Sequence, residues 1–362
     1  MPTSRDRCLK AVLHEEVDRI PLVLRIRPEP LSRLAKFLGL EGSPYVHEEV
    51  CRALGVDVRS TPGIRLKGSS EPDPSTPRDE EGGWLIGSVG RFELHRNLWG
   101  VETLWAPDHT YTYTYYRHPF TTIEELEAFE WPRVLYEDQA FVEAARKRYE
   151  DYWVGTGTLQ AFETAWKLTG LGRFLLGMQK DDPLIIRILD NLFSLSTQQA
   201  ILASEAGVDF ITNGDDVGAQ KSMLVSPRLW RRYLKPRYAA MFREVHKRGA
   251  FVLFHSDGWI EPIIPDLIEV GVDILNPIQP ECMDPARLKE LYGERLCFEG
   301  TIGVQSTLPL ATPEKVAEEV RQRIRKCGPT GLILGPTHSI QPDVPIENIL
   351  AMYEAARSYR LR

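Results

Sequence analysis

Short apolar runs alternate with longer stretches of helical periodicity through the last two thirds of the chain. Several of these runs are rich in β-branched or aromatic residues, which favour extended structure. The runs that read as strands are 153–157 (WVGTG), 208–212 (VDFIT), 250–254 (AFVLF), 272–276 (VDILN), 296–300 (LCFEG) and 331–335 (GLILG). Strands that alternate with helical patterns predict a parallel sheet whose strands are joined by crossover helices.

Polar residues followed directly by proline mark four helix starts between these runs. In such a pair the cap oxygen accepts a hydrogen bond from a free backbone N–H, and proline at the first helical position gives up no internal bond. The four pairs are Asp182-Pro183, Ser226-Pro227, Asp284-Pro285 and Thr312-Pro313. Each predicts a helix that begins at its proline.

The N-terminal third begins with the same rhythm and then departs from it. An apolar run at 20–26 and helical patterns at 31–38 and 48–54 predict a first strand and helix. Residues 61–120 contain a polar loop at 69–77 and alternating aromatic segments from 84 to 116, which predict β-hairpins in an insertion. Thr122 and Glu125 then form a capping-box pattern that opens the next helix.

Two architectures alternate strands and helices: the closed barrel and the open doubly wound sheet. No GxGxxG turn follows the first strand, so the main sign of a dinucleotide-binding sheet is missing. A length of 362 residues fits one barrel with an insertion. We therefore predict a single α/β domain over 1–362, a (β/α)8 TIM barrel with an irregular hairpin-containing insertion in its N-terminal third.

Charge and cysteine content narrow the classes of partner. A net charge of −7 lacks the basic excess that nucleic-acid binding needs. No apolar run is long enough for a membrane span, and the first ten residues have no hydrophobic signal core, so we expect a cytoplasmic protein. Five cysteines without a CxxC pair predict reduced thiols, and we interpret Cys282 and Cys297, near strand ends, as bystanders.

In a barrel, polar residues that follow each strand gather at one mouth. His255 and Asp257 follow one run and His338 follows the last, and imidazole nitrogens and carboxylate oxygens are normal zinc ligands. The alternative is a purely structural role, in which Asp257 caps the next helix and His255 forms a hydrogen bond within the barrel. Asp215 and Asp216 are either an acid/base pair or turn formers beside Asn213-Gly214.

Other side chains near the mouth have both functional and structural interpretations. Glu299 directly follows an apolar run, where a carboxylate is hard to explain structurally, and we favour a functional role. Trp99, Trp105 and the aromatic residues of 111–116 either line a ligand site or pack a hairpin on the barrel. Arg25 and Arg27 either bind carboxylates or face solvent.

Three long segments carry a resemblance to a known family. They are GVDFITNGDDVGAQKSMLVSP (207–227), FVLFHSDGWIEPIIPDLIEVGVDILNPIQP (251–280) and GPTHSIQPDVPIENILAMYEA (335–355). Together they resemble the uroporphyrinogen decarboxylase-like proteins, which include corrinoid-dependent methyltransferases. The resemblance implies the (β/α)8 barrel.

The methyltransferase branch of that family has His-x-Cys after the corresponding strand and a further cysteine after the last strand, where they bind a zinc ion that activates a thiol. Here the first position matches as His255, the second is Asp257, and the last strand is followed by His338. The decarboxylases carry an arginine-rich N-terminal motif that binds porphyrinogen carboxylates. The corresponding RIPLVLRIRPEP lacks its glycine-centred pattern, whereas His338 parallels a histidine near the decarboxylase C-terminus.

These observations lead to one hypothesis with two alternatives. We expect a methyltransferase that moves a methyl group between a small molecule and a corrinoid carried on a partner protein; a homodimer is compatible with the sequence. The alternatives are decarboxylation of a tetrapyrrole and a non-catalytic barrel that binds a ligand or partner. We expect zinc ligands at His255, Asp257 and His338, catalytic groups at Glu299 and Asp216, and substrate contacts at Asn213, Asp215, Asn276, Gln279 and Gln341.

Overall fold

Seven parallel strands form the central sheet of the computed structural model, which describes residues 2–68, 71–73, 75–79, 81–106 and 113–361. The strand order is β1-β8-β9-β10-β11-β12-β13. The strands are β1 Val58–Ser60, β8 Trp153–Gly157, β9 Phe210–Gly214, β10 Phe251–His255, β11 Ile274–Asn276, β12 Cys297–Glu299 and β13 Leu332–Ile333. All six strands predicted after residue 150 are therefore confirmed.

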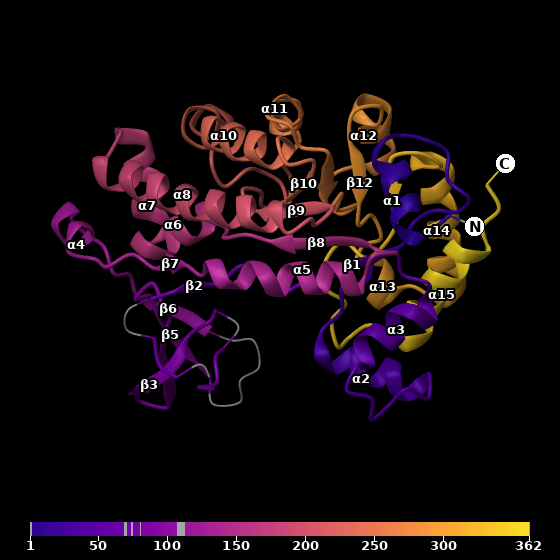
Figure 1. The fold of residues 1–362 in the computed structure, drawn as a ribbon, viewed down its shortest axis with the longest axis horizontal. Helices are drawn as coiled ribbons and strands as arrows, with labels where there is room; N and C mark the ends of the chain where they lie inside the picture. Colours follow the sequence, from indigo (N-terminus) through magenta and orange to yellow (C-terminus); the bar gives the residue numbers. More distant parts are fainter. Residues whose placement is uncertain (1, 69–70, 74, 80, 107–112, 362) are drawn as a thin grey trace.

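Helices connect successive strands and pack on the outside of the curled sheet, as α8, α10, α11 and α12 do in Figure 1. The predicted starts at Pro183, Pro227, Pro285 and Pro313 are confirmed, each with its cap side chain bonded to a backbone N–H. The α-helices are α1 Ser4–Val12, α2 Pro28–Phe37, α3 Val46–Leu54, α4 Ile123–Glu127, α5 Gln139–Arg148, α6 Ala161–Thr169, α7 Leu171–Lys180, α8 Pro183–Glu205, α9 Pro227–Leu229, α10 Lys235–His246, α11 Ile264–Glu269, α12 Pro285–Tyr292, α13 Thr307–Leu310, α14 Pro313–Cys327 and α15 Ile346–Ser358. Within the described residues, every helix is too short or too polar to cross a membrane.

The segment 20–26 lies between the two edges of the sheet but forms only isolated bridges. Leu22 pairs with Leu334 and Ile26 with Ile340, both in parallel, while the backbone N–H of Asp57 donates to the Leu22 carbonyl over 2.8 Å. Pro21 has no N–H to donate, which weakens a regular ladder here. The strand predicted at 20–26 is thus an extended segment linked to both edges.

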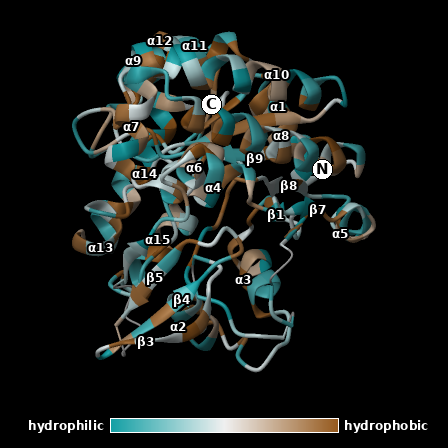
Figure 2. Cartoon of the chain, turned by 90° about the vertical axis from the view of Figure 1, so that its left-hand side faces the viewer, coloured by the Kyte–Doolittle hydropathy of each residue, from teal (hydrophilic) through white to brown (hydrophobic). Residues whose placement is uncertain are grey.

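A four-stranded antiparallel sheet contains the predicted hairpins, in the order β3-β4-β5-β6. Its strands are β3 Trp84–Val89, β4 Phe92–Arg96, β5 Glu102–Trp105 and β6 Tyr113–Arg117, and β2 Leu66–Lys67 pairs separately with β7 Arg133–Val134. Tyr111, named among the candidate aromatic residues, lies outside the described residues. Figure 2 shows hydrophobic residues on β3, where Leu85 and Ile86 are exposed.

The buried carboxylate of Asp138 fastens the chain near β2 to the short 3-10 helix η1, Tyr136–Asp138. It accepts hydrogen bonds from the backbone N–H of Arg65 at 2.8 Å and from its guanidinium Nε and Nη2 at 2.9 and 2.8 Å. This pairing with Arg65 lowers the pKa of Asp138 in the folded protein. The charge of Asp138 therefore stabilises the fold at neutral pH.

We predict that Asp138→Asn lowers the free energy of unfolding by about 1–2 kcal/mol at pH 7, because charged hydrogen bonds are lost at a buried site. A carboxyl whose folded pKa is depressed contributes stability above its unfolded pKa, near 3.9, and loses it as pH falls through the folded pKa. The difference between wild type and variant should thus shrink as urea unfolding is repeated from pH 7 toward pH 3. The exposed neighbour Glu137→Gln is the control, and a deficit that is constant with pH would contradict this assignment.

Candidate active site

His255 ends β10 and lies in register between Gly214 of β9 and Asn276 of β11. A side chain at 214 would place its Cβ 2.9 Å from the Cβ of His255, closer than such atoms approach. Glycine at 214 therefore makes room for the imidazole at the carboxyl end of the sheet, where the ends of parallel strands converge.

Two carboxylates join His255 at these strand ends. Within the described residues, Asp216, His255 and Asp257 form a group whose candidate metal-ligand atoms all lie within 4.8 Å of one another. His255 Nε2 is 3.8 Å from Asp216 Oδ1 and 3.9 Å from Asp257 Oδ1. The Asp257 backbone N–H donates to Asp216 Oδ1 over 2.8 Å, so the loop after β10 holds the Asp216 carboxylate in place.

A chain of buried polar groups orients the imidazole from behind. His255 Nδ1 is 2.6 Å from Asn276 Oδ1, and Asn276 Nδ2 is 3.1 Å from the Glu299 carbonyl and 3.2 Å from Glu299 Oε1. The guanidinium of Arg25 forms an ion pair with the same carboxylate oxygen. Gly300 leaves space for this contact, since a Cβ there would lie 2.8 Å from Asn276 Nδ2.

These contacts fix the tautomer of His255. The backbone carbonyl and carboxylate of Glu299 only accept, so the NH2 group of Asn276 must face them and its carbonyl must face His255. Nδ1 of His255 is then the protonated nitrogen, and a neutral imidazole presents the lone pair of Nε2 to the two aspartates. Metal-binding histidines are oriented in this way by a partner on the other nitrogen.

A polar cavity of about 610 Å³ opens in front of this group. It is lined by His255, Asp216 and His338, and also by Trp99 from the turn between β4 and β5 and by Tyr113 of β6. Its remaining lining residues are Arg27, Glu81, Asn97, Gln160, Glu163, Thr164 and Lys167. The stretch predicted as an insertion therefore contributes part of the cavity wall.

Charged groups on the cavity wall pair between α6 and the loop before β3. Lys167 Nζ lies 2.9 Å from Glu81 Oε2 and 3.8 Å from Glu163 Oε2, and the Tyr113 hydroxyl donates to Glu81 Oε1 over 2.6 Å. Burial, with the nearby charge of Asp216, raises the pKa of Glu163, and burial also raises the pKa of Asp257. Burial lowers the pKa of His338, which favours its neutral form.

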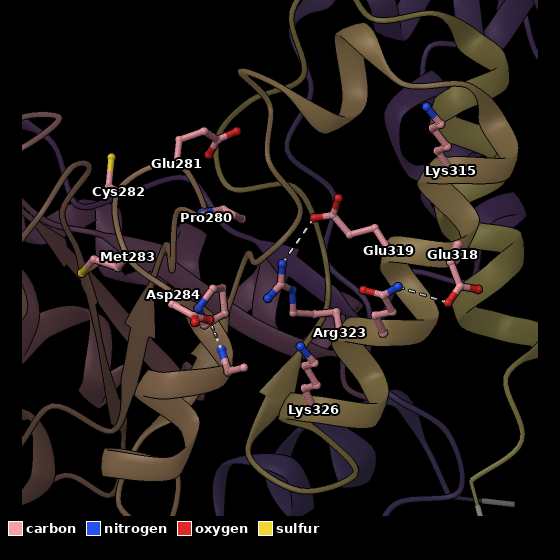
Figure 3. Close-up of a pocket in the computed structure, with 13 residues that line it drawn as sticks. Pro280, Glu281, Cys282, Met283, Asp284, Lys315, Glu318, Glu319, Arg323 and Lys326 are labelled. Carbon is pink, nitrogen blue, oxygen red and sulfur yellow. Dashed lines mark hydrogen bonds and ion pairs between the residues drawn. The ribbon is translucent and has the colours of Figure 1, made fainter.

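A second cavity of about 620 Å³ lies elsewhere, between the loop 280–286 and α14 (Figure 3). Two of its charged residues pair with each other, Arg323 with Glu319 at 3.3 Å. Cys282 belongs to this wall and is half-buried, while Cys297 is fully buried. The predicted zinc, catalytic and substrate-contact residues are not part of this lining, so we assign it no role.

Comparison with known proteins identifies the family. The model of uroporphyrinogen decarboxylase (URO-D) matches residues 109–359, well over half of the chain. The chain belongs to the uroporphyrinogen decarboxylase family. The predicted resemblance to this family is confirmed.

Curated methyltransferases and decarboxylases are both similar to this chain. A methylcobamide:CoM methyltransferase MtaA of Methanosarcina barkeri is 27% identical over 48% of this chain and 49% of its own length. A uroporphyrinogen decarboxylase of Thermus thermophilus is 28% identical over 49% of each chain. The chain thus spans about half the length of the curated relatives it matches.

A solved structure, a methyltransferase from Methanosarcina mazei, has a TM-score of 0.66 and 19% identity and covers 99% of both chains. At this identity the likeness shows a shared fold alone. The chain therefore has an α/β fold with a curled parallel sheet, which confirms the α/β class that we predicted.

The group of candidate metal ligands in the structure differs from the predicted set in one residue. His255 and Asp257 lie together, but the third member of the group is Asp216, which we had predicted as a catalytic acid or base. His338 lies outside that group, with its ring centre 6.3 Å from that of His255, and lines the cavity instead. The neighbouring strand thus supplies the third ligand, because Asp216 lies two residues after the end of β9.

Glu299 lies behind the site rather than in it. It is 1% exposed and binds Arg25 and Asn276, so it orients His255 through Asn276 instead of meeting a substrate. Arg25, left open between a carboxylate ligand and a solvent-facing residue, is the counter-ion of Glu299. The catalytic role predicted for Glu299 stays a prediction, and these contacts favour an orienting role.

The five predicted substrate contacts, all within the described residues, lie outside the cavity lining. Asn213 and Gly214 belong to β9 rather than to a turn, and Asn213 bonds Thr158 at 2.9 Å. Asp215 is buried, accepts from the Glu163 backbone N–H at 3.0 Å and from the Tyr238 hydroxyl, and burial raises its pKa to about 8. The other three bond within the protein: Asn276 to His255, Gln279 to the Gly258 N–H and Gln341 to the Ser339 carbonyl.

Sequence analysis named Trp99, Arg27 and the aromatic residues of 111–116 as candidate ligand contacts, but it missed other polar and charged residues of the cavity wall. Gln160 and Glu163 follow β8, so the strand-exit rule that identified His255 could have found them. Glu81 carries no such signal, because it reaches Lys167 across 86 residues of sequence.

We predict that Glu299→Gln weakens zinc binding about 10–100-fold, as expected when a group that orients a metal-binding histidine is altered. The amide keeps the size of the side chain but loses the charge that pairs with Arg25, so Asn276 is held less firmly. Competition with a chromophoric chelator measures the dissociation constant, and Glu319→Gln in the second cavity is the control. Equal affinity of both variants and wild type would remove Glu299 from the site.

Proposed function

We propose that this protein is a methyltransferase that moves a methyl group between a small molecule and a corrinoid held by a partner protein. The observation that carries the proposal is the Asp216, His255 and Asp257 group at the edge of a polar cavity, with His255 oriented through Asn276. Membership of a family that includes a methylcobamide methyltransferase supports the same reaction class.

The donor set fits a divalent zinc ion. Tetrahedral ligands that are each about 2.1 Å from one zinc lie about 3.4 Å apart. His255 Nε2 is 3.8 and 3.9 Å from the two carboxylates, and the three donor atoms all lie within 4.8 Å of one another, so small side-chain movements would bring them onto one ion. One nitrogen and two carboxylate oxygens make a harder site than a thiolate site. A bound zinc would supply Lewis-acid activation of the polar atom that gives or receives the methyl group.

The protein's own residues set the remaining conditions for transfer. The paired Glu81 and Lys167 and the half-buried Glu163 offer hydrogen bonds that orient a small polar molecule against the group. The flanking Trp99 and Tyr113 cover part of the cavity and reduce its exposure to water.

The charge of the cavity disfavours the decarboxylase alternative. Three carboxylates, Glu81, Glu163 and Asp216, face the cavity against two cations, Arg27 and Lys167, and Lys167 is already paired with Glu81. A substrate with many carboxylates would meet like charges, and each buried carboxylate needs a charged partner. A small molecule of low charge fits better.

We also infer that residues 1–362 form one closed (β/α)8 barrel with an insertion at about 61–120. The segment 20–26 would be its first strand, since it links Leu334 beside β13 to Asp57 beside β1. This placement puts Arg25 at the mouth, next to Glu299.

Optical spectroscopy tests the function. Zinc-loaded protein is mixed with methylcobalamin and a small thiol, and separately with cob(I)alamin and small methylated donors. The proposal expects the corrinoid spectrum to change in one of the two mixtures, the one that matches the direction of methyl transfer. With apoprotein, the spectrum should remain unchanged in both mixtures. Release of carbon dioxide from uroporphyrinogen without any methyl transfer would instead establish the decarboxylase.

A further inference from the structure

The wall of the barrel separates between the segment 20–26 and β1. Two hydrogen bonds join them just before β1. The Asp57 N–H donates to the Leu22 carbonyl at 2.8 Å, and the Leu22 N–H donates to Asp57 Oδ2 at 2.9 Å. Among the described residues, the bridges of this segment run to Leu334 and Ile340, and every residue of β1 pairs with β8. After Leu22, the described residues of this segment therefore form no backbone ladder with β1.

A chamber of about 420 Å³ lies at this separation. Its lining comes from both sides of the split, from the strands next to β1, and from α3 and the residue after α5. These residues are Val23, Leu24 and Arg25; Val58, Arg59 and Ser60; Gly157, Phe210 and Thr212; and His47, Glu48 and Tyr149. Helices α3 and α5 flank β1 in Figure 1, and Arg148 lies over the Tyr45 ring at 5.0 Å.

The chamber reaches the inside of the sheet. Val23, Val58 and Phe210 belong to the buried layer that also contains Leu253. Alternation along β1 puts Ser60 on the same inward face as Val58, yet Ser60 is exposed. The lining also includes Arg59, on the opposite face of β1, together with His47 of α3 and Tyr149 after α5, so the chamber extends from the inward face of the sheet to its outside.

The lining has a definite chemistry. Its floor is apolar, with Val23, Val58 and Phe210, and the hydroxyls of Ser60 and Thr212 lie above it. The charged pair Arg59 and Glu48 is closed on itself at 2.6 Å and leaves little charge for a ligand. A small uncharged molecule with one apolar side and one hydrogen-bonding group matches this chamber.

The chamber also adjoins the candidate metal group. Arg25 lines it and pairs with Glu299, which holds Asn276 and through it His255. A molecule in the chamber therefore lies one side chain away from the groups that orient the imidazole.

We propose that this side chamber takes up the small uncharged substrate from solvent and is its route of access to the barrel while the corrinoid partner covers the mouth. The reaction itself takes place in the mouth cavity. The inference rests on the proposed function, because a covered mouth is what makes a second route necessary. The separation of the wall and the exposure of Ser60 exist independently of that function.

Thiol labelling tests the route without any methyl-transfer assay. Ser60→Cys is made in a Cys282→Ser background, since the other four cysteines are buried. The probe is methyl methanethiosulfonate, which is small and uncharged. Its rate is compared with that of the sulfonate-bearing analogue, each relative to free cysteine, and we expect the charged reagent to react about tenfold more slowly because a charge is costly to desolvate.

Two matched blocking variants locate the entrance. His47→Trp fills the chamber from the α3 side and should slow labelling about tenfold, whereas Gln160→Trp in the mouth cavity should leave the rate unchanged. Tyr149→Ala widens the same side entrance and should accelerate labelling, which keeps the test decisive if His47→Trp does not fold.

Slowing by Gln160→Trp with no effect of the side variants would overturn the proposal. If the labelling pattern holds but no methyl transfer is found, the proposed function fails and the chamber remains.

Discussion

Replacing His255 with alanine is expected to abolish methyl transfer and to weaken zinc binding by more than about 100-fold, because it removes a direct ligand rather than an orienting group. Asp216 and Asp257 would remain as two carboxylates, 40% and 36% exposed, that retain a divalent ion only loosely. Chelator competition measures the affinity, and the corrinoid spectrum measures the transfer.

The chain offers a matched histidine control. His246 lies on α10, away from the cavity, and its Nε2 is 2.9 Å from Asp273 Oδ2. His246→Ala should keep both zinc affinity and transfer. An unchanged zinc affinity in His255→Ala would place the metal elsewhere, and equal losses in both variants would indicate a general structural defect.

Replacing Asp57 with alanine is expected to lower the free energy of unfolding by about 3–5 kcal/mol, the cost of breaking a buried charged network on one side. Asp57 is fully buried and accepts from the Ser4 hydroxyl at 2.8 Å, Arg7 at 2.7 Å, and Arg19 at 2.7 and 2.8 Å. It also accepts from the Leu22 N–H at 2.9 Å. One carboxylate therefore fastens α1 and the segment 20–26 to β1.

Asp18 is the control for this change, because it binds the same Arg7 at 2.7 and 2.8 Å but is 41% exposed. Exposed ion pairs contribute about 0–1 kcal/mol, so Asp18→Ala should have a small effect. Chemical unfolding monitored by circular dichroism compares the two. Similar losses of unfolding free energy in the two variants would show that Asp57 does not join the two edges of the sheet.

The sequence predicted the regular half of the fold well, because each element there carries its own local signal. The strands after residue 150 are apolar runs, and helices such as α8 begin at a polar cap and proline. The segment 20–26 has the same apolar character but bridges only at Leu22 and Ile26. Hydropathy cannot reveal whether an extended segment forms a continuous ladder.

The candidate site was predicted only where it follows the strand ends. His255 was found because it ends an apolar run, and Asp216 and Asp257 were found because each lies two residues after the end of a strand, β9 or β10. The role of Glu299 depends on an ion pair with Arg25 that spans 274 residues. Adjacent residues also diverge, since Asp215 turns into the core while Asp216 meets His255, and that choice is made by packing.

Metal content is the most direct test of the claim that Asp216, His255 and Asp257 form one metal centre. Elemental analysis of protein loaded with zinc and then desalted gives the ratio of metal to chain, for wild type and for Asp257→Ala. The structure predicts about one zinc for each wild-type chain and a clear loss in the variant, in keeping with a small set of direct ligands. No bound zinc in wild type, or full retention in Asp257→Ala, would contradict it.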